Sequence, residues 1–310
     1  MNAVEISRLH KSFNSHKVID GLSLIVPEHS LYGLLGQNGA GKTTTMKMAL
    51  GLLKIDHGTI SIFGEEVRYG QTATNRHVGF LPDVPEFYGY MKPHEYLELC
   101  AKITGVPHDM IKPRIKELLE LVGLEQANKR IGGYSRGMKQ RLGIAQAMIN
   151  EPKLLICDEP TSALDPIGRK EILEILLTLK GKTTVIFSTH ILSDVERVCD
   201  HIGVLSGGKL ALEGNLSEIK NQVRTDTIEV EFTSTEQLKA FLSLSEVHIL
   251  LSVLPDPKRF ISNSLIRFET ETMEKTQLIL IRSLADANLV PNRFERLEPT
   301  LENLFMEVVK

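Results

Sequence analysis

The feature that most constrains this chain is a glycine-rich stretch, GQNGAGKTT, at residues 36–44. It fits the pattern GxxxxGK[ST], follows an apolar run at 31–35 and precedes a helical pattern that begins at Lys42. Glycines let backbone amides approach an anion closely, and a helix N-terminus adds partial positive charge. The stretch therefore predicts a phosphate-binding loop. The residues expected to contact a nucleotide there are Gly36, Gln37, Asn38, Gly39, Ala40, Gly41, Lys42, Thr43 and Thr44.

Two side chains of this loop have distinct expected roles. Lys42 is expected to pair with the β- and γ-phosphates, and Thr43 to offer its hydroxyl to Mg²⁺. The alternative, a glycine-rich turn with a surface lysine, does not account for the strand before the loop and the helix after it. The loop indicates a nucleotide but not a reaction.

A pair of acids ends a second apolar run. Residues 154–157 read LLIC, and Asp158 and Glu159 follow directly. Ligands of open α/β sheets gather at the carboxyl ends of the strands. We therefore expect Asp158 to hold Mg²⁺ through water and Glu159 to orient and deprotonate an attacking water. The alternative is an acidic turn that only caps the next helix.

A histidine ends a third apolar run in the same way. His190 follows the strand-like residues 184–187 and is expected to contact the γ-phosphate and the water through its ring nitrogens. A hydrogen-bonded structural histidine is the alternative, and it is the interpretation we adopt for the other nine histidines.

The first two-thirds of the chain alternates strand and helix patterns, which predicts an α/β domain with a largely parallel sheet. Strands are expected at 4–9, 22–26, 31–35, 154–157 and 184–187, and helices at 42–50, 93–103, 111–122, 136–149 and 166–179. A hairpin is expected to join 202–205 to 209–213.

A second, small α+β domain is expected at 225–310, after a nucleotide-binding domain at 1–224. Alternating patterns predict strands at 228–232 and 265–269, and further strands are expected at 247–253 and 293–297. With helices at 235–242 and 273–287, these segments predict a β-α-β-β-α-β module. A last helix is expected to begin at Thr300.

The composition of the chain excludes some classes of protein and indicates the cellular compartment. The formal net charge of -3 and the pI of about 6.4 argue against a protein that mainly holds nucleic acid. Three cysteines outside any CxxC pair indicate free thiols in a reducing compartment. No window approaches the roughly 18 apolar residues of a membrane-spanning helix. We expect no signal peptide, because Glu5, Arg8 and Lys11 stand where its apolar stretch would lie. We expect a cytoplasmic protein.

A motif upstream of the two acids indicates the family. Residues 134–141, YSRGMKQR, resemble the signature motif of ATP-binding-cassette (ABC) ATPases, and residues 162–165, SALD, resemble their D-loop. Together with the phosphate loop, the acids and His190, the resemblance covers about residues 1–224. It implies a mixed sheet with flanking helices and a helical signature subdomain, ATP and Mg²⁺ as cofactors, and ATP hydrolysis.

The resemblance also implies that two nucleotide-binding domains pair head to tail. Ser135, Arg136, Gly137 and Met138 would then contact the ATP of the other subunit, and Asp165 would lie in the D-loop. Phe13 matches the aromatic residue that stacks on adenine in this family, and a core phenylalanine is the alternative.

Two residues depart from the family pattern. Arg136 replaces a glycine of the most common signature, and Asp83 stands where most members have the glutamine of the Q-loop. A carboxylate can still bind Mg²⁺, so Asp83 joins Thr43 and Asp158 as an expected metal residue. Its part in coupling is left open.

The signature and residues 299–305, PTLENLF, resemble those of bacterial drug, antibiotic and peptide exporter ATPases, including the bacitracin- and daunorubicin-resistance kind. This implies an ATP-hydrolysing subunit on the inner face of the membrane, bound to separately encoded permease subunits. Pairing with a second copy or with another ABC subunit stays open. The alternatives are a soluble ABC ATPase that acts as a regulatory switch, a ribosomal or DNA-repair cassette, and an importer subunit.

Overall fold

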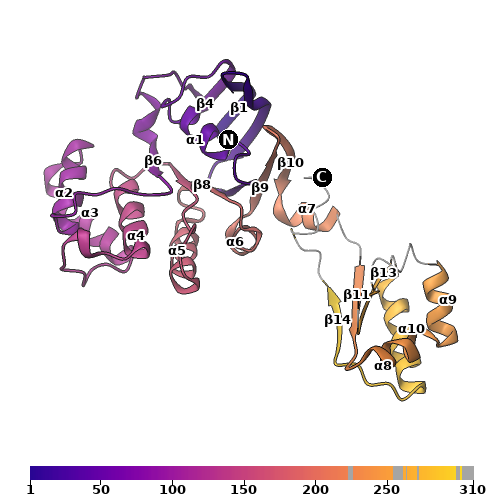
Figure 1. Ribbon diagram of the computed structural model, residues 1–310. Helices are drawn as coiled ribbons and strands as arrows, with labels where there is room; N and C mark the ends of the chain where they lie inside the picture. Colours follow the sequence, from indigo (N-terminus) through magenta and orange to yellow (C-terminus); the bar gives the residue numbers. More distant parts are fainter. Residues whose placement is uncertain (223–225, 254–260, 263, 271, 298–300, 302–310) are drawn as a thin grey trace. The chain divides into compact units, whose positions relative to one another are not determined.

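The structure, a computed structural model, describes residues 1–222, 226–253, 261–262, 264–270, 272–297 and 301. The chain forms two compact units, Met1–Ser217 and a second that begins at Glu218 (Figure 1). The predicted boundary between residues 224 and 225 and the predicted helix start at Thr300 lie outside the described residues.

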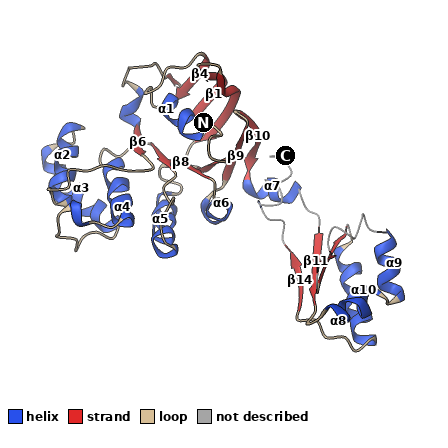
Figure 2. Cartoon of the chain, in the orientation of Figure 1, coloured by secondary structure: helices blue, strands red, loops and turns tan. Residues whose placement is uncertain are grey.

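A six-stranded sheet forms the centre of the first unit, in the order β10-β9-β3-β8-β7-β6. Figure 2 labels β6, β8, β9 and β10 of this sheet. Five strands run parallel, and β10 pairs with β9 as the predicted antiparallel hairpin. Every residue of β3, β7 and β8 is buried, because both faces of these strands are covered. The strands are β3 (Leu31–Leu35), β6 (Val78–Leu81), β7 (Leu154–Asp158), β8 (Thr184–Thr189), β9 (His201–Ser206) and β10 (Lys209–Asn215).

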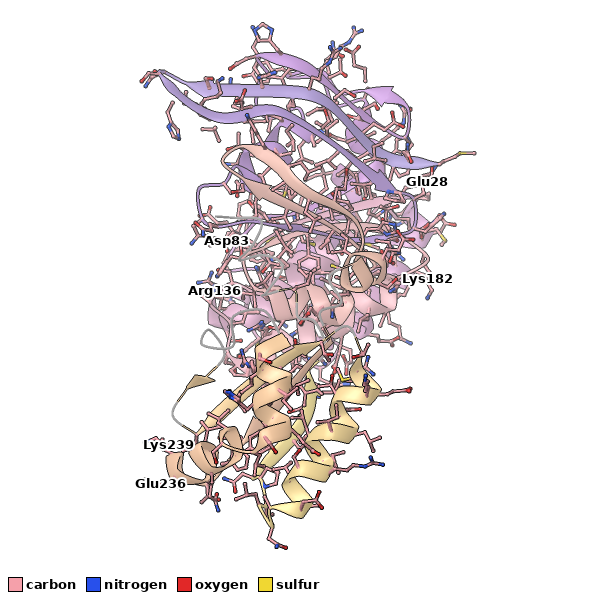
Figure 3. The ribbon with its side chains drawn as sticks, turned by 90° about the vertical axis from the view of Figure 1, so that its right-hand side faces the viewer. Glu28, Asp83, Arg136, Lys182, Glu236 and Lys239 are labelled. Atoms are coloured by element: carbon pink, nitrogen blue, oxygen red, sulfur yellow. The ribbon has the colours of Figure 1, made fainter. Side chains whose placement is uncertain are left out.

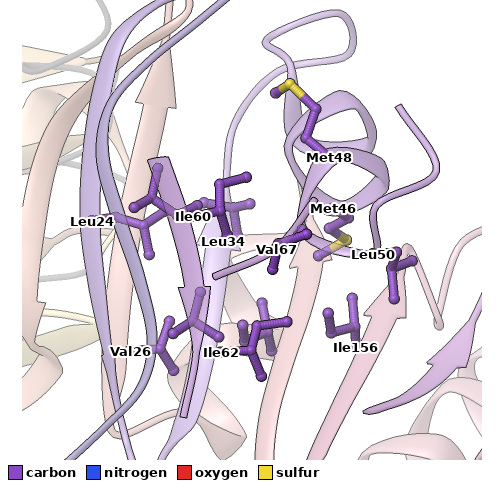
Figure 4. Close-up of a cluster of buried hydrophobic side chains, with 14 of the residues drawn as sticks. Leu24, Val26, Leu34, Met46, Met48, Leu50, Ile60, Ile62, Val67 and Ile156 are labelled. Carbon is purple, nitrogen blue, oxygen red and sulfur yellow. The ribbon is translucent and has the colours of Figure 1, made fainter. Parts of the chain in front are cut away.

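A separate antiparallel sheet has the order β2-β1-β4-β5. Its strands are β1 (Asn2–Phe13), β2 (His16–Pro27), β4 (His57–Ile62) and β5 (Glu65–Glu66). Helix α1 (Lys42–Ala49) contacts both β4 of this sheet and β7 of the central sheet. Leu24, Ile60 and Ile62 share one apolar cluster with Met46 of α1 and Ile156 of β7 (Figure 4). Burial of this cluster holds the helix that follows the phosphate loop in place.

Three helices beyond β6 form the predicted helical subdomain (Figure 1). Helices α2 and α3 pack on each other and on α4, and α4 packs on β6. Two 3-10 turns, η1 (Thr74–His77) and η2 (Ile131–Gly133), precede β6 and α4. The other helices of this part of the chain are α5, α6 and α7. The bounds are α2 (Pro93–Ile103), α3 (His108–Leu121), α4 (Arg136–Ala147), α5 (Pro166–Leu179), α6 (Leu192–Val198) and α7 (Leu216–Gln222).

The close approach of β6 to α4 depends on a glycine. A Cβ added at Gly79 would lie 2.1 Å from the backbone oxygen of Ala147. Overpacking of this kind costs about 1–3 kcal/mol, so Gly79→Ala should lower the melting temperature of the first unit by roughly 2–12 °C. Gly133→Ala is the matched control, because its added Cβ would have its nearest neighbour, Lys129 Cδ, at 3.9 Å. Equal melting temperatures of the two variants by calorimetry would contradict this account.

The second unit packs helices on one four-stranded antiparallel sheet, in the order β12-β13-β11-β14. Ile228, Val230 and Phe268 of the sheet pack against Phe241 and Leu280 of the helices. Its strands are β11 (Asp226–Glu231), β12 (Ile261–Ser262), β13 (Leu265–Thr270) and β14 (Arg293–Leu297), and its helices are α8 (Thr235–Leu242), α9 (Ser245–Val253) and α10 (Met273–Asp286).

The prediction of a strand at 247–253 is wrong, because these residues lie in helix α9. Val247 is buried and Leu250 and Leu251 are partly buried in the core of the unit, whereas Ile249 is exposed. Burial three and four residues after Val247 is helical spacing. A short apolar run does not distinguish a buried strand from a buried helix by its periodicity. The order is therefore β-α-α-β-β-α-β.

Two further observations concern the cysteines and the membrane. All three cysteines are free thiols, and burial raises the pKa of Cys157 and Cys199 well above the ordinary value, which keeps both thiols protonated. Of the helices in the described part of the chain, none combines the length and the apolar character needed to cross a bilayer.

Candidate functional site

The phosphate loop lies between β3 and α1, so one strand–loop–helix turn brings together nine of the ten residues predicted to bind the nucleotide, all except Phe13. Gly41 has a φ of +105°, in the left-handed region, and a Cβ there would lie 2.5 Å from Ile19 Cδ1. At Gly36 a Cβ would lie 2.6 Å from the backbone oxygen of Leu205. Only glycine fits these two positions without a shift of their neighbours.

Lys42 places a shielded cation at this loop. Its Nζ donates hydrogen bonds to the backbone oxygens of Gly36 (2.7 Å) and Gln37 (3.2 Å). It also lies 3.2 Å from Glu159 Oε1, and Lys42 is only 5 % exposed. Thr43, by contrast, is exposed. Low exposure strengthens the attraction between this amine and any anion that reaches it.

The acids Asp158 and Glu159 end β7 next to β8. The hydroxyl of Ser188 on β8 donates to Asp158 Oδ1 at 2.7 Å and accepts from the backbone N–H of Glu159 at 3.0 Å. Sequence reasoning missed Ser188, although it stands two residues before His190 at the end of the same strand. Its hydroxyl sets the position of the first acid relative to the second.

Glu159 lies between a cation and a histidine. Its Oε1 faces Lys42, and its Oε2 lies 3.0 Å from His190 Nδ1. Glu159 itself has a φ of +48°, which turns the chain sharply after β7. The side chain of His190 is 44 % exposed and open to a ligand. The ends of β3, β7 and β8 thus bring together three residues that sequence analysis had selected separately.

The signature and D-loop residues begin helices. Ser135 caps α4, because its Oγ accepts from the backbone N–H of Met138 at 3.2 Å. Asp165 caps α5 by accepting from Gly168 N–H at 3.1 Å. A Cβ added at Gly137 would meet no described atom within 4 Å, so the first turn of α4 has open space at that point.

The two residues that depart from the family pattern face each other. Asp83 Oδ1 lies 3.6 Å from Arg136 Nη2, and both side chains are about half-exposed. Figure 3 labels the two residues. The buried side chain of Gln140 on α4 donates to the backbone oxygen of Asp83 at 3.0 Å. A cavity of about 480 Å³ is lined by both members of the pair and by Val84, Phe87, Ile131 and Lys139. No sequence pattern indicated that these two residues lie in contact.

Phe13 ends β1 and is 46 % exposed, so it does not belong to the core. The Lys11 amine lies 5.3 Å from the centre of its ring, over the aromatic face. The ring is therefore accessible for stacking.

Two family patterns match the chain. One, described as ABC transporter, matches residues 19–162, which hold the phosphate loop, the signature and both acids. The other, described as ATP-binding protein DrrA1-3-like, C-terminal domain, matches residues 214–309.

Curated relatives match over most of the chain. The uncharacterized ABC transporter ATP-binding protein YxlF of Bacillus subtilis (strain 168) is 38 % identical over 307 residues, 99 % of each chain. The bacitracin transport ATP-binding protein BcrA of Bacillus licheniformis is 41 % identical over 246 residues, 78 % of each chain.

Solved structures share the fold. The protein cbiO1 from Clostridium perfringens, described as part of the ABC transporter complex cbiONQ, aligns with a TM-score of 0.66 at 25 % identity. That alignment covers 81 % of this chain and 99 % of the other. An ATP binding subunit of an ABC transporter aligns with a TM-score of 0.64 at 32 % identity, over 71 % and 92 % of the two chains.

Proposed function

The chain belongs to the ABC transporter ATP-binding family and is an ATPase, and from this premise we propose that it powers a bacterial exporter of drugs, antibiotics or peptides. The observation that carries the hydrolytic part is the contact of Glu159 with both Lys42 and His190. The similarity to BcrA supports the exporter part.

We propose Mg²⁺ as the second cofactor, held by Thr43 and Asp158. The exposed hydroxyl of Thr43 and the shielded carboxylate of Asp158 are the oxygen donors that this ion prefers. The ion would neutralise charge on the phosphates of bound ATP. Asp83 can bind the same Mg²⁺ only if its carboxylate first leaves the guanidinium of Arg136.

In the proposed reaction Glu159 orients a water and accepts its proton as the water oxygen bonds to the γ-phosphorus. The bond from that phosphorus to the β–γ bridging oxygen breaks, and ADP leaves with the electron pair. Lys42 holds the phosphate. His190 contacts the Glu159 carboxylate through Nδ1, and its ring also contacts the γ-phosphate and the water. Phe13 stacks on the adenine.

We further propose that ATP closes two nucleotide-binding domains, either two copies of this chain or this chain and another ABC subunit. Ser135, Arg136, Gly137 and Met138 at the start of α4 would meet the γ-phosphate bound to the partner, and Asp165 would lie at the junction. ADP lacks that phosphate, so hydrolysis removes contacts to both subunits and reopens the pair.

Separately encoded permease subunits are the proposed membrane partners, with the chain at the inner face of the membrane. The cavity beside Asp83 is the proposed point of coupling. One wall of the cavity is formed by residues that precede α2, and the other by residues of the first turn of α4. A permease segment bound there would therefore move when the signature residues move.

The test is a purification of tagged Glu159→Gln protein from native membranes in mild detergent with ATP, with the same sample in ADP as the control. We expect a polytopic membrane protein in near-equal amount, enriched in ATP. Ribosomal proteins, DNA-repair factors or no partner would contradict the exporter proposal and favour a soluble ATPase switch.

Exchanging the charges of Asp83 and Arg136 tests the proposed coupling point. A half-exposed pair contributes up to about 1 kcal/mol, so Asp83→Arg or Arg136→Asp should lower permease-stimulated ATPase activity up to about fivefold. The double exchange should recover part of the loss, because opposite charges face each other again. The rest of the loss should remain, because a carboxylate at position 136 replaces the cation proposed to meet the partner's γ-phosphate. Additive losses in the double variant, measured as phosphate release in proteoliposomes, would contradict this coupling.

A further inference from the structure

A buried carboxylate outside the proposed catalytic contacts lies on helix α6. Asp194 is 2 % exposed, and its two oxygens accept from two different segments. Thr161 Oγ1 donates to Oδ2 at 2.8 Å, and Arg169 Nε donates to Oδ1 at 2.6 Å. Arg169 also donates through Nη2 to the neighbouring Ser193 Oγ at 2.9 Å. The carboxylate is therefore fully engaged, with its charge balanced by a guanidinium.

The partners of Asp194 mark the two ends of one loop. Thr161 stands two residues after Glu159, and Arg169 lies in the first turn of α5, which Asp165 caps. Between them, Ala163 has a φ of +51°, a conformation that a residue with a side chain adopts at a cost. The loop 162–165 is thus a strained segment whose two flanks are bonded to the same carboxylate.

Helix α6 is also tied to the hydrolytic contacts. It begins two residues after His190, whose Nδ1 contacts Glu159 Oε2. One ring of contacts therefore runs from Glu159 through Thr161 to Asp194, and back along α6 to His190. A shift of α6 relative to Thr161 would move His190 relative to Glu159.

We propose that Asp194 is a positioning residue for ATP hydrolysis, which holds loop 162–165 and the Glu159–His190 contact in one geometry through Thr161 and Arg169. The inference rests on the proposed function, because it assigns loop 162–165 to the junction between paired domains. Nucleotide binding by a single domain depends on the phosphate loop and not on this ring of contacts.

Apolar packing should keep α6 folded even when the contact that gives Asp194 its positioning role is removed. Val195 and Val198 of α6 are buried, so they hold the helix on the sheet without the Thr161 bond. Removing the Thr161 hydroxyl leaves the Asp194–Arg169 ion pair and nearly all of the side-chain volume in place. The change therefore loosens the loop and leaves the core filled.

The test compares Thr161→Val, which has the same shape without a hydroxyl, with Thr161→Ser, which keeps the hydroxyl. A displacement near 1 Å at reacting groups can cost about 100-fold, so we expect kcat of Thr161→Val to fall about 10- to 100-fold, with KM for ATP within about twofold. Thr161→Ser should restore kcat to within about threefold of the unchanged protein. ATP-driven pairing of Thr161→Val in a Glu159→Gln background should weaken, while ATP binding by single domains stays unchanged.

Turnover of Thr161→Val equal to that of the unchanged protein, with only a lower melting temperature, would overturn the positioning role. A rise in KM with kcat unchanged would overturn it as well. If Thr161→Val does not fold, Arg169→Lys replaces it, because lysine keeps the charge without the guanidinium geometry and should give the same fall in kcat at constant KM. Failure of the proposed pairing is distinguishable, since the Glu159→Gln protein with Thr161 unchanged would then not pair in ATP.

Discussion

ATP turnover is expected to fall by about 10²–10⁴-fold when Glu159 is replaced by glutamine, while ATP still binds. The amide has nearly the same shape as the carboxylate and can still bond to His190, but it cannot accept a proton from water. Binding depends on Lys42 and on the backbone of the phosphate loop, which the substitution leaves in place. Steady-state phosphate release and titration with a fluorescent ATP analogue measure the two effects.

The matched control is Glu120→Gln, which removes the same charge from an exposed position on α3. Its turnover should stay within about twofold of the unchanged protein, because surface substitutions far from a site have small effects. Normal hydrolysis by the Glu159 variant would show that another group activates the water. Loss of ATP binding in that variant would instead give Glu159 a role in holding the loop.

Lys42→Ala should weaken ATP binding itself, whereas Glu159→Gln should lower turnover and leave binding intact. Hydrogen bonds to charged groups contribute about 1.5–3 kcal/mol, which corresponds to roughly 10- to 150-fold in affinity. The removed amine is shielded from solvent, so water replaces it poorly as a partner for phosphate oxygens. Isothermal titration with ATP measures the loss directly.

Lys47→Ala is the control for Lys42→Ala, because Lys47 carries the same charge on the exposed side of α1. It should bind ATP with unchanged affinity. Equal affinities of the two variants would mean that the loop amides hold the phosphates without the lysine. A Lys42 variant that binds normally but hydrolyses slowly would move the role of this residue from binding to catalysis.

Local sequence signals predicted most elements of the fold. The predicted ranges of α2, α5, α8 and β3 agree with the structure at both ends. Helix α2 begins at Pro93, a favoured first helical residue, and α5 begins after the capping side chain of Asp165. These signals act within one turn of the chain, so they can be found without the tertiary structure.

Local sequence signals gave wrong or incomplete predictions where contacts between distant segments decide the secondary structure or the sheet to which a strand belongs. Residues 247–253 form a helix because α9 packs against α8 and α10, and Glu246 of α9 accepts a hydrogen bond from Ser283 of α10. The strands expected at 4–9 and 22–26 belong to a separate antiparallel sheet, and no local pattern assigns a strand to a sheet.

The sequence by itself determined the chemical groups and their order along the chain, namely the phosphate loop with Lys42, the acid pair that includes Glu159, and His190. Motif spacing and strand ends are local properties, and they placed these groups at one edge of a sheet before any contact was known. Only the tertiary structure decided which distant groups meet. Gln140 reaches the Asp83 backbone across 57 residues, and Thr161 reaches Asp194 across 33. Such contacts depend on how helices pack against the sheet, which no pattern within one segment encodes.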